Sequence, residues 1–123
     1  MSDSTTTIAE LRALVQQFVD ERQWRQFHAP KNLSMALAIE AAELMEHFQW
    51  IDAEASRDLP ADPAKLAAAA EELADVMAYG FALANELGLD LATAIRAKMI
   101  KNAQKYPADS FRGRYEKPRS TDP

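Results

Sequence analysis

Residues 39–50 have the sequence IEAAELMEHFQW, and residues 71–79 have the sequence EELADVMAY. Both stretches are rich in residues that favour α-helix, and each carries two acidic side chains at a spacing of three. The pairs are Glu40 with Glu43 and Glu72 with Asp75. Because an α-helix turns by about 100° per residue, this spacing puts both members of a pair on one face. Two such helices, packed together, would direct four carboxylates into one small volume.

The whole chain has the composition of an all-α protein. Its 123 residues suffice for one domain and are too few for two. Glycine is scarce, and apolar side chains recur at the spacing of amphipathic helices. We expect an all-α four-helix bundle with short connections. The predicted helices cover residues 8 to about 22–24, about 33 to 50, 63 to about 87, and 91 to 106. The apolar stripes expected to face the core include Leu14, Phe18 and Val19 in the first helix, Leu33, Leu37, Leu44 and Phe48 in the second, and Leu66, Leu73, Val76, Met77, Leu83 and Leu87 in the third.

Capping residues and prolines set the expected limits of these helices. The candidate N-caps are Thr7, Asn32, Asp62 and Asp90. Pro30 disfavours helix at Ala29, so residues 23–31 are expected to be irregular, and residues 51–62 form the main loop. Gly88 stops the third helix and Pro107 the fourth. We therefore predict one domain over residues 1–107, followed by an extended or disordered tail over residues 108–123.

Charge and cysteine content exclude several classes of function. The net charge of −5 argues against non-specific nucleic-acid binding, which depends on a basic surface. The absence of cysteine excludes disulfides, thiolate nucleophiles, zinc–thiolate sites and iron–sulfur clusters. The first residues lack the basic start and apolar core of a signal peptide, and no apolar run is long enough to cross a membrane. We expect a cytoplasmic protein with neither nucleic acid nor membrane as a partner.

The four carboxylates are candidate metal ligands. Crowded negative charge is costly unless a positive charge lies among it, and all-oxygen ligation favours Mg²⁺, with Mn²⁺ as a possible substitute. Glu40 falls within the apolar face of its helix, about 40° from Leu44, where a solvated surface charge is not expected. His47 does not follow either acid at the Glu-x-x-His spacing of di-iron bundles. The alternative is a set of flanking acids that pair with Lys and Arg.

Two further groups of residues complement the acids. Lys98 and Asn102 recur at a spacing of four, with Tyr106 one turn later, and their donors suit a polyphosphate. The alternative is an ordinary solvated helix face. Aromatic residues gather in the first loop and at the end of the second helix, where flat rings can stack on a nucleobase or simply cover the ends of the bundle. They are Trp24, Phe27, His28 and Trp50.

The ordered series of these motifs resembles a known family. The series consists of WRQFHAPKNL (24–33), Glu40-x-x-Glu43, HFQW (47–50), EELADVMAY (71–79) and KM-x-KN-x-QKYP (98–107). It is similar to the all-α nucleoside triphosphate pyrophosphohydrolases of the MazG-like superfamily, and to their dCTP pyrophosphatase-like branch in particular. The resemblance covers roughly residues 8 to 107, nearly the whole predicted domain.

The resemblance implies a Mg²⁺-dependent hydrolase that cleaves a nucleoside triphosphate, dCTP or a modified dCTP, to the monophosphate and pyrophosphate. It implies a homo-oligomer, either a dimer or a homotetramer built as a dimer of dimers. Carried over to this chain, the metal ligands are Glu40, Glu43, Glu72 and Asp75, the phosphate-binding residues are Lys98, Asn102 and Tyr106, and the base and sugar pocket is formed by Trp24, His28, Trp50 and Tyr79. Glu40 and Glu43 are also the candidates for accepting the proton of the attacking water.

Two other functions remain open at this stage. A phosphoribosyl-ATP pyrophosphohydrolase would share the acidic core but lack the Trp and His series. A non-catalytic helical module that binds a nucleotide or a partner protein would gain no Mg²⁺-dependent stability with nucleotide.

Overall fold

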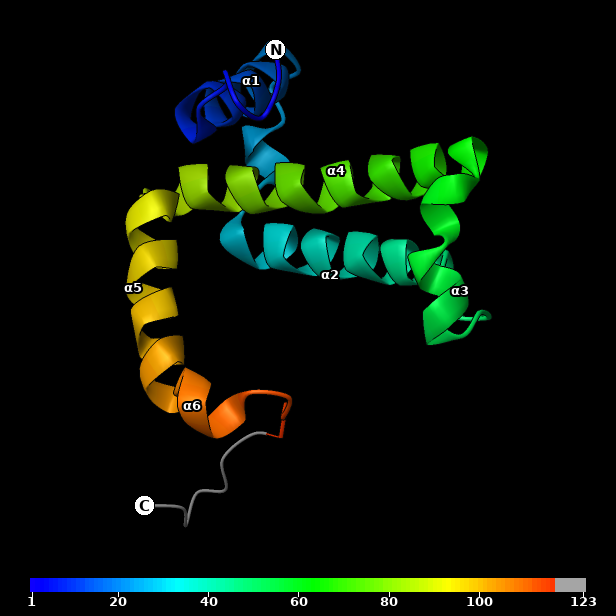
Figure 1. Cartoon of the computed structure of the whole chain (residues 1–123). Helices are drawn as coiled ribbons and strands as arrows, with labels where there is room; N and C mark the ends of the chain where they lie inside the picture. Colours follow the sequence, from blue (N-terminus) through cyan, green and yellow to red (C-terminus); the bar gives the residue numbers. More distant parts are fainter. Residues whose placement is uncertain (117–123) are drawn as a thin grey trace. The chain divides into compact units, whose positions relative to one another are not determined.

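The computed structural model describes residues 1–116 and contains only helices and connections in that part of the chain (Figure 1). The predicted all-α class is therefore confirmed. In chain order the elements are α1 (Ile8–Glu21), η1 (Arg25–Phe27), α2 (Pro30–Glu46), α3 (Ala53–Arg57), η2 (Leu59–Ala61), α4 (Pro63–Leu87), α5 (Leu91–Lys105) and α6 (Ala108–Phe111), where η marks a 3₁₀-helix. Among the described residues, no helix is long and apolar enough to cross a membrane.

The chain divides into two compact units, Met1–Leu89 and a second that begins at Asp90. The first unit holds α1 to α4, and the second holds α5 and α6. The sequence did not indicate a division at this point, and the single domain over residues 1–107 stays a prediction. The expected extended tail is wrong at Ala108–Phe111, which form α6. Residues 117–123 of that tail lie outside the described residues.

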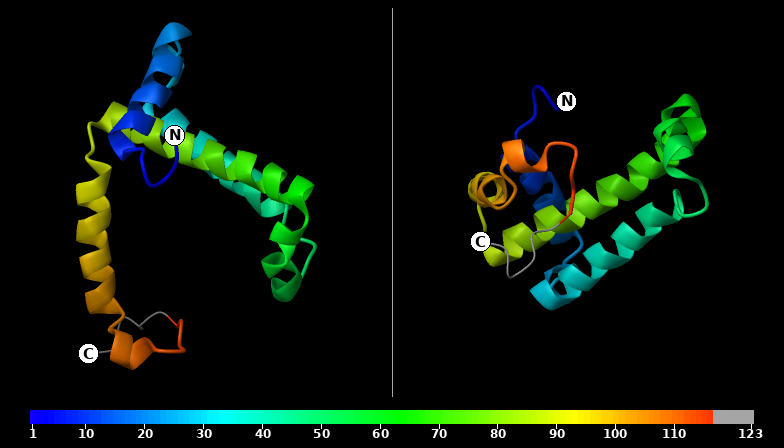
Figure 2. Two further views of the ribbon diagram at one scale, coloured as in Figure 1. Left: turned by 45° about the horizontal axis from the view of Figure 1, so that its top comes forward. Right: turned by 60° about the horizontal axis from the view of Figure 1, so that its bottom comes forward.

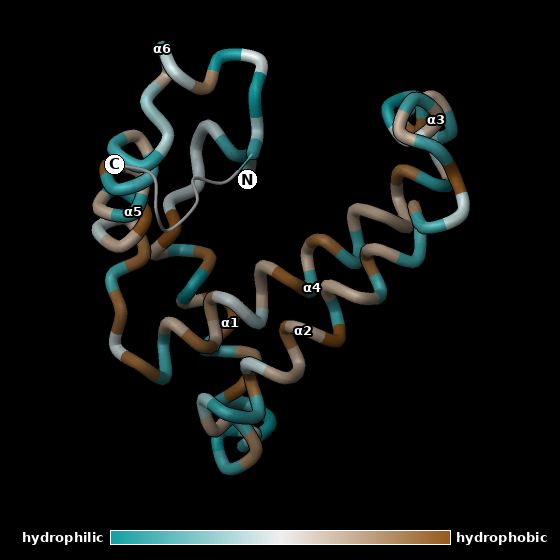
Figure 3. Tube along the Cα trace, turned by 90° about the horizontal axis from the view of Figure 1, so that it is seen from below, coloured by the Kyte–Doolittle hydropathy of each residue, from teal (hydrophilic) through white to brown (hydrophobic). Residues whose placement is uncertain are grey.

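The centre of the first unit is the pair of helices α2 and α4, which lie side by side (Figures 1 and 2). Figure 3 shows hydrophobic and hydrophilic residues alternating along both helices. Leu33 of α2 is only 1% exposed, and the buried residues of α4 are Ala69, Phe81, Ala82 and Ala84. Small alanine side chains let two helices approach closely, so the carboxylates on their facing sides can come within reach of one another.

Helix α1 packs against α4 and buries Val19. Its N-terminus is closed by a capping box, in which the Thr7 side chain accepts from Glu10 N–H and the Glu10 carboxylate accepts from Thr7 N–H. Near the C-terminal end of α4, the side chain of Asn85 forms hydrogen bonds with Arg12 of α1. These contacts fix the place of α1, and therefore of the loop that follows it, on the helix pair.

The predicted starts of three helices are confirmed, and so is the predicted end of α4. Helix α1 begins after Thr7 as expected. Helix α4 begins after Asp62, whose carboxylate accepts from two backbone N–H groups, and it ends at Gly88 with φ 64°. Helix α5 begins after Asp90 and stops one residue short of the predicted Tyr106.

The predicted limits of α2 are wrong at both ends. It begins at Pro30, because proline is preorganised for the first helical position and lacks only an N–H that has no partner there. Asn32 is not its cap, since the Asn32 amide instead donates to the carbonyl of Phe27. The helix ends at Glu46. After it, the N–H groups of His47 and Phe48 donate to carbonyls three residues earlier, which is the tighter 3₁₀ pattern common at helix ends.

The expected apolar stripe of α4 is only partly buried. Four of its predicted core residues are in fact exposed in the chain by itself: Leu66 (44%), Leu73 (51%), Met77 (50%) and Leu87 (51%). The long helix contacts α2 and α1 along part of its surface, so one apolar side of it has no cover within the first unit. The prediction that these side chains form the core of this chain is therefore wrong.

Candidate functional site

Three carboxylates meet between α2 and α4. Glu40 and Glu43 extend from α2 and Glu72 from α4, and one oxygen of each lies within 4.8 Å of the others. The spacing of three on α2 gives this arrangement directly, because it aligns Glu40 and Glu43 along the face that meets α4. The predicted meeting of acidic residues from two helices is thus present in the structure for these three side chains.

The buried oxygens of this cluster lack partners. Oε2 of Glu40 and Oε2 of Glu72 are both buried, and neither has a hydrogen-bond partner. Buried carboxylate oxygens are normally hydrogen-bonded or bound to a cation, since leaving one unpaired is unfavourable. Within residues 1–116, no Lys or Arg forms an ion pair with either group. The described part of the chain therefore supplies no ion-pair partner for these two carboxylates.

The crowding changes the acidity of two of these groups. Hydrogen bonding of the protonated form with Glu43, then burial, then the charges of Glu43, Asp75 and Glu72, raise the pKa of Glu40 to about 7. Burial and then the charge of Glu43 raise the pKa of Glu72 above its usual range. Asp75 lies outside the group of three oxygens but follows Glu72 by three residues in α4, and its charge contributes to both shifts.

The donor set of this cluster fits a hard divalent cation. All its candidate ligand atoms are carboxylate oxygens, which Mg²⁺ and Mn²⁺ prefer, and Glu40 and Glu72 each have a buried oxygen that is free to bind an ion. Zinc and redox iron usually take nitrogen or sulfur ligands as well, and no histidine or cysteine belongs to the group. The described residues therefore form a candidate divalent-metal centre.

The predicted base-pocket residues are spread over the first unit. Trp24 and His28 lie together in the loop between α1 and α2, with ring centroids 6.3 Å apart and planes inclined by 49°. The Trp24 side chain is partly open to solvent, and Trp50, in the turn after α2, is 88% exposed. Tyr79 is half-buried on α4, one turn after Asp75. The structure brings Trp24 and His28 together, and the common pocket of all four stays a prediction.

The predicted phosphate-binding residues belong to the second unit. On α5, the Asn102 amide lies 3.7 Å from the Met99 sulfur, and Lys98 is exposed. Tyr106 follows the helix, with its ring edge-on to Phe111 at 5.1 Å. The predicted role of these three residues in phosphate binding stays a prediction.

Comparison with known proteins places the chain in a family. The family model described as MazG-like matches residues 35–117, about two thirds of the sequence. The chain belongs to the MazG-like family. The matched region contains Glu40, Glu43, Glu72 and Asp75, and it begins after Trp24 and His28.

Individual proteins similar to this MazG-like chain are named as pyrophosphatases. A bovine protein named dCTP pyrophosphatase 1 is 41% identical over 110 residues, and its human counterpart is 42% identical over 102. These matches cover 89% and 83% of this chain but 65% and 60% of the relatives, so the chain spans less than two thirds of their length. The crystal structure of a pyrophosphatase from Archaeoglobus fulgidus is similar with a TM-score of 0.73 and 34% identity, over 87% of this chain and 98% of that one.

One group of residues around Trp24 of this MazG-like chain was not recognised from sequence. Phe18 was assigned to the core stripe of the first helix, but it is 48% exposed and its ring contacts Trp24, with centroids 5.6 Å apart. Arg22 lies on the same ring. The available signal was the spacing of four between Phe18 and Arg22, which makes them neighbours on a helix surface.

Proposed function

We propose that this MazG-like protein is a Mg²⁺-dependent nucleoside triphosphate pyrophosphohydrolase. It cleaves dCTP or a modified dCTP between the α- and β-phosphates and releases the monophosphate and pyrophosphate. The observation that carries the proposal is the 41–42% identity to proteins named dCTP pyrophosphatase 1, extending over 83–89% of this chain. The three-carboxylate cluster supports it, because phosphoanhydride hydrolysis needs positive charge beside the phosphates.

The carboxylates hold the metal. Glu40, Glu43 and Glu72 supply the ligand oxygens that already lie together, and Asp75 completes the set from the next turn of α4. A divalent ion bound there would neutralise phosphate charge and orient the substrate. A carboxylate oxygen of Glu40 or Glu43 accepts the proton of the water whose oxygen attacks the α-phosphorus. The bond between the α-phosphorus and the bridging oxygen then breaks, and pyrophosphate leaves.

The aromatic side chains hold the base and sugar. Trp24 offers a partly open ring on which a base can stack, and His28 next to it offers ring nitrogens to a base or sugar edge. Trp50 and Tyr79 complete this pocket in the proposal. Lys98, Asn102 and Tyr106 bind the phosphates, a role that rests on the matched motif KM-x-KN-x-QKYP alone.

The proposal is tested with a panel of nucleotides. The expected result is Mg²⁺-dependent release of pyrophosphate and dCMP from dCTP, faster than from the other deoxynucleoside and ribonucleoside triphosphates. Chelation of Mg²⁺ is expected to abolish turnover. Preferential turnover of phosphoribosyl-ATP would instead indicate a phosphoribosyl-ATP pyrophosphohydrolase. If no tested nucleotide yields pyrophosphate above the enzyme-free control, the proposed enzymatic function is rejected.

Single substitutions test the residue roles. Glu40→Gln and Asp75→Asn are each expected to lower kcat by a factor of about 10² or more, because each removes a charged oxygen from the metal centre. Glu71→Gln is the matched control, since Glu71 is exposed and immediately precedes Glu72 in α4. Full activity in both Glu40→Gln and Asp75→Asn would contradict the metal assignment. Lys98→Ala is expected to weaken substrate binding.

We further propose that the active protein is a homodimer or a dimer of dimers. The apolar side chains of α4 that lack cover in one chain, Leu73 and Met77 among them, suit burial against a second copy. Light scattering after size-exclusion chromatography is expected to give at least twice the mass of one chain, and Leu73→Lys is expected to reduce that mass. A monomer that turns over dCTP at full rate would reject the assembly but not the activity.

A further inference from the structure

The residue before Trp24 stands in an uncommon backbone conformation. Gln23 has φ 54°, in the left-handed region that side chains other than glycine seldom adopt. Its N–H donates to the carbonyl of Asp20 at 3.0 Å, while Trp24 N–H donates to the carbonyl of Val19 at 3.0 Å. This pair of bonds is the Schellman motif, in which a left-handed residue closes the end of a helix. The end of α1 therefore fixes the backbone of Trp24.

The same motif accounts for the ring contact of Trp24. The residue after the left-handed position commonly packs against an apolar residue in the last turn of the helix. Here these two residues are Trp24 and Phe18, whose rings meet edge to face with centroids 5.6 Å apart and planes at 78°. Edge-to-face geometry is a favourable arrangement of two aromatic rings. Phe18 thus limits the orientations that are open to the Trp24 side chain.

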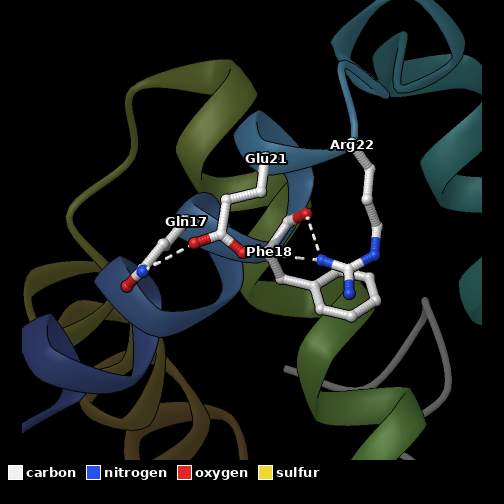
Figure 4. Close-up of polar contacts among 4 residues, drawn as sticks. All are labelled: Gln17, Phe18, Glu21 and Arg22. Carbon is white, nitrogen blue, oxygen red and sulfur yellow. Dashed lines mark hydrogen bonds and ion pairs between the residues drawn. The ribbon is translucent and has the colours of Figure 1, made fainter.

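Phe18 itself is held from another side by Arg22. Figure 4 shows the Arg22 guanidinium over the Phe18 ring, with its carbon 3.6 Å from the ring centroid. Arg22 Nη1 also donates to the Phe18 carbonyl at 3.1 Å and lies 3.8 Å from Glu21 Oε2. The Glu21 carboxylate in turn accepts from the Gln17 amide at 2.8 Å. Successive contacts thus connect Gln17, Glu21 and Arg22 to the ring of Phe18, which in turn contacts Trp24.

We propose that Phe18 is a positioning residue that orients the Trp24 ring for stacking on the nucleobase. The left-handed turn at Gln23 fixes the backbone of Trp24, and Phe18, covered by Arg22, fixes its side chain. The role of Trp24 in base binding belongs to the proposed function, on which this inference rests. Preorganisation of a ring lowers the ordering cost of binding, so its loss is expected in the affinity for nucleotide and not in the chemical step.

The first test compares substitutions at Phe18. Phe18→Leu removes the ring but keeps an apolar side chain, and it is expected to weaken binding of a non-hydrolysable α,β-imido dCTP by roughly three- to tenfold. KM for dCTP rises similarly while kcat stays unchanged. Phe18→Tyr keeps the ring and restores both values. Leu14→Ala, one turn earlier on α1 and also exposed, is the control and retains wild-type affinity.

The second test observes Trp24 directly. The chain has two tryptophans, so Trp50→Phe leaves Trp24 as the single tryptophan emitter. In that background, adding Phe18→Leu is expected to shift tryptophan emission to longer wavelength and to increase quenching by acrylamide, whereas Phe18→Tyr does neither. This measurement needs no substrate and therefore does not depend on the proposed function. Circular dichroism checks that each variant is folded.

The outcomes separate this inference from the proposed function. If the wild-type protein turns over dCTP and folded Phe18→Leu matches it in nucleotide affinity, the positioning role is rejected and the proposed function stands. If kcat falls with no change in affinity, the role assigned to Phe18 is also rejected. If the wild-type protein turns over no nucleotide, the proposed function fails, and unchanged Trp24 emission in Phe18→Leu would then reject the orientation of Trp24 by Phe18 independently.

Discussion

Glu40 of α2 and Glu72 of α4 each keep one carboxylate oxygen buried without a hydrogen-bond partner, and the two side chains belong to one cluster of ligand atoms within 4.8 Å. Such a pair is unfavourable when both groups are ionised, because like charges repel and burial removes their hydration. The chain relieves this in part by raising the pKa of Glu40 to about 7, so that the group can keep its proton. A divalent cation would remove the need for that proton.

The stability of the metal-free protein is therefore expected to fall as pH rises. The folded-state pKa of Glu40, about 7, lies above its ordinary value of 4.5, so the folded state holds this proton more tightly than the unfolded state. The stabilisation is fully present below the ordinary value and is lost as pH rises through about 7. Thermal unfolding in chelator should show a lower Tm at about pH 8 than at about pH 6.

Mg²⁺ is expected to counteract this loss of stability at high pH. Metal binding requires ionised carboxylates, so the increase in Tm on adding Mg²⁺ should be larger above neutral pH than below it. Isothermal titration should detect proton release on Mg²⁺ binding near neutral pH. An equal Tm increase with Mg²⁺ across the range would indicate that the ion binds elsewhere.

Glu40→Gln should separate the effect of charge from that of shape. The amide occupies a similar volume but cannot ionise, so the pH dependence of Tm in chelator should become flatter and the increase with Mg²⁺ should shrink. Glu46→Gln is the control, because Glu46 is exposed at the end of the same helix. If both variants behave like the wild type, Glu40 is not part of a metal centre.

Local sequence signals account well for the part of the site that lies on regular helices. The spacing of Glu40 and Glu43 predicts their common face, and Asp62 with Pro63 and Gly88 predict the limits of α4, because capping and the φ of glycine are local properties. The meeting of Glu72 with the first pair then follows from packing the two apolar helices together. This is why the carboxylate cluster could be predicted from sequence.

Ambiguous local signals and non-local packing account for the failures. Pro30 disfavours helix at the residue before it and is equally suited to the first helical position, so the proline alone does not show that α2 begins there. Leu73 and Met77 fit the apolar spacing of a buried helix face but are exposed in this chain. The spacing does not tell whether the side chains that bury such a face belong to the same chain or to a second copy. The contact between Phe18 and Trp24 requires the left-handed turn at Gln23, and glutamine gives no signal for such a turn.

Arg12 and Asn85 form the polar connection between α1 and α4. Arg12 Nε donates to Asn85 Oδ1 at 2.9 Å, Arg12 Nη1 donates to the Leu89 carbonyl at 2.6 Å, and Asn85 Nδ2 donates to the Arg12 carbonyl at 3.1 Å. Asn85→Ala leaves a partly buried guanidinium nitrogen and a carbonyl without these partners, so we expect it to lower the free energy of unfolding by about 1–3 kcal/mol. Urea denaturation measures this loss.

Gln16→Ala is the comparison for Asn85→Ala. It removes a hydrogen bond of similar length, 2.8 Å to Asp20, but that bond lies at the surface within one helix. Its loss should cost no more than about 0.5 kcal/mol. Equal effects of the two substitutions would show that the connection between α1 and α4 adds nothing beyond an exposed hydrogen bond.

Two glycines of the first unit should respond to the same substitution with opposite signs. Gly80 lies inside α4, and a Cβ added there would meet Leu37 Cδ1 at 3.8 Å, an ordinary van der Waals distance. Gly80→Ala should therefore stabilise the protein by about 0.5–1 kcal/mol, because alanine favours helix and restricts the unfolded chain. Gly88 has open space around it but φ 64°, so Gly88→Ala should destabilise by about 1 kcal/mol through backbone strain. Chemical denaturation of both variants measures the signs, and a stabilising Gly88→Ala would contradict the left-handed end of α4.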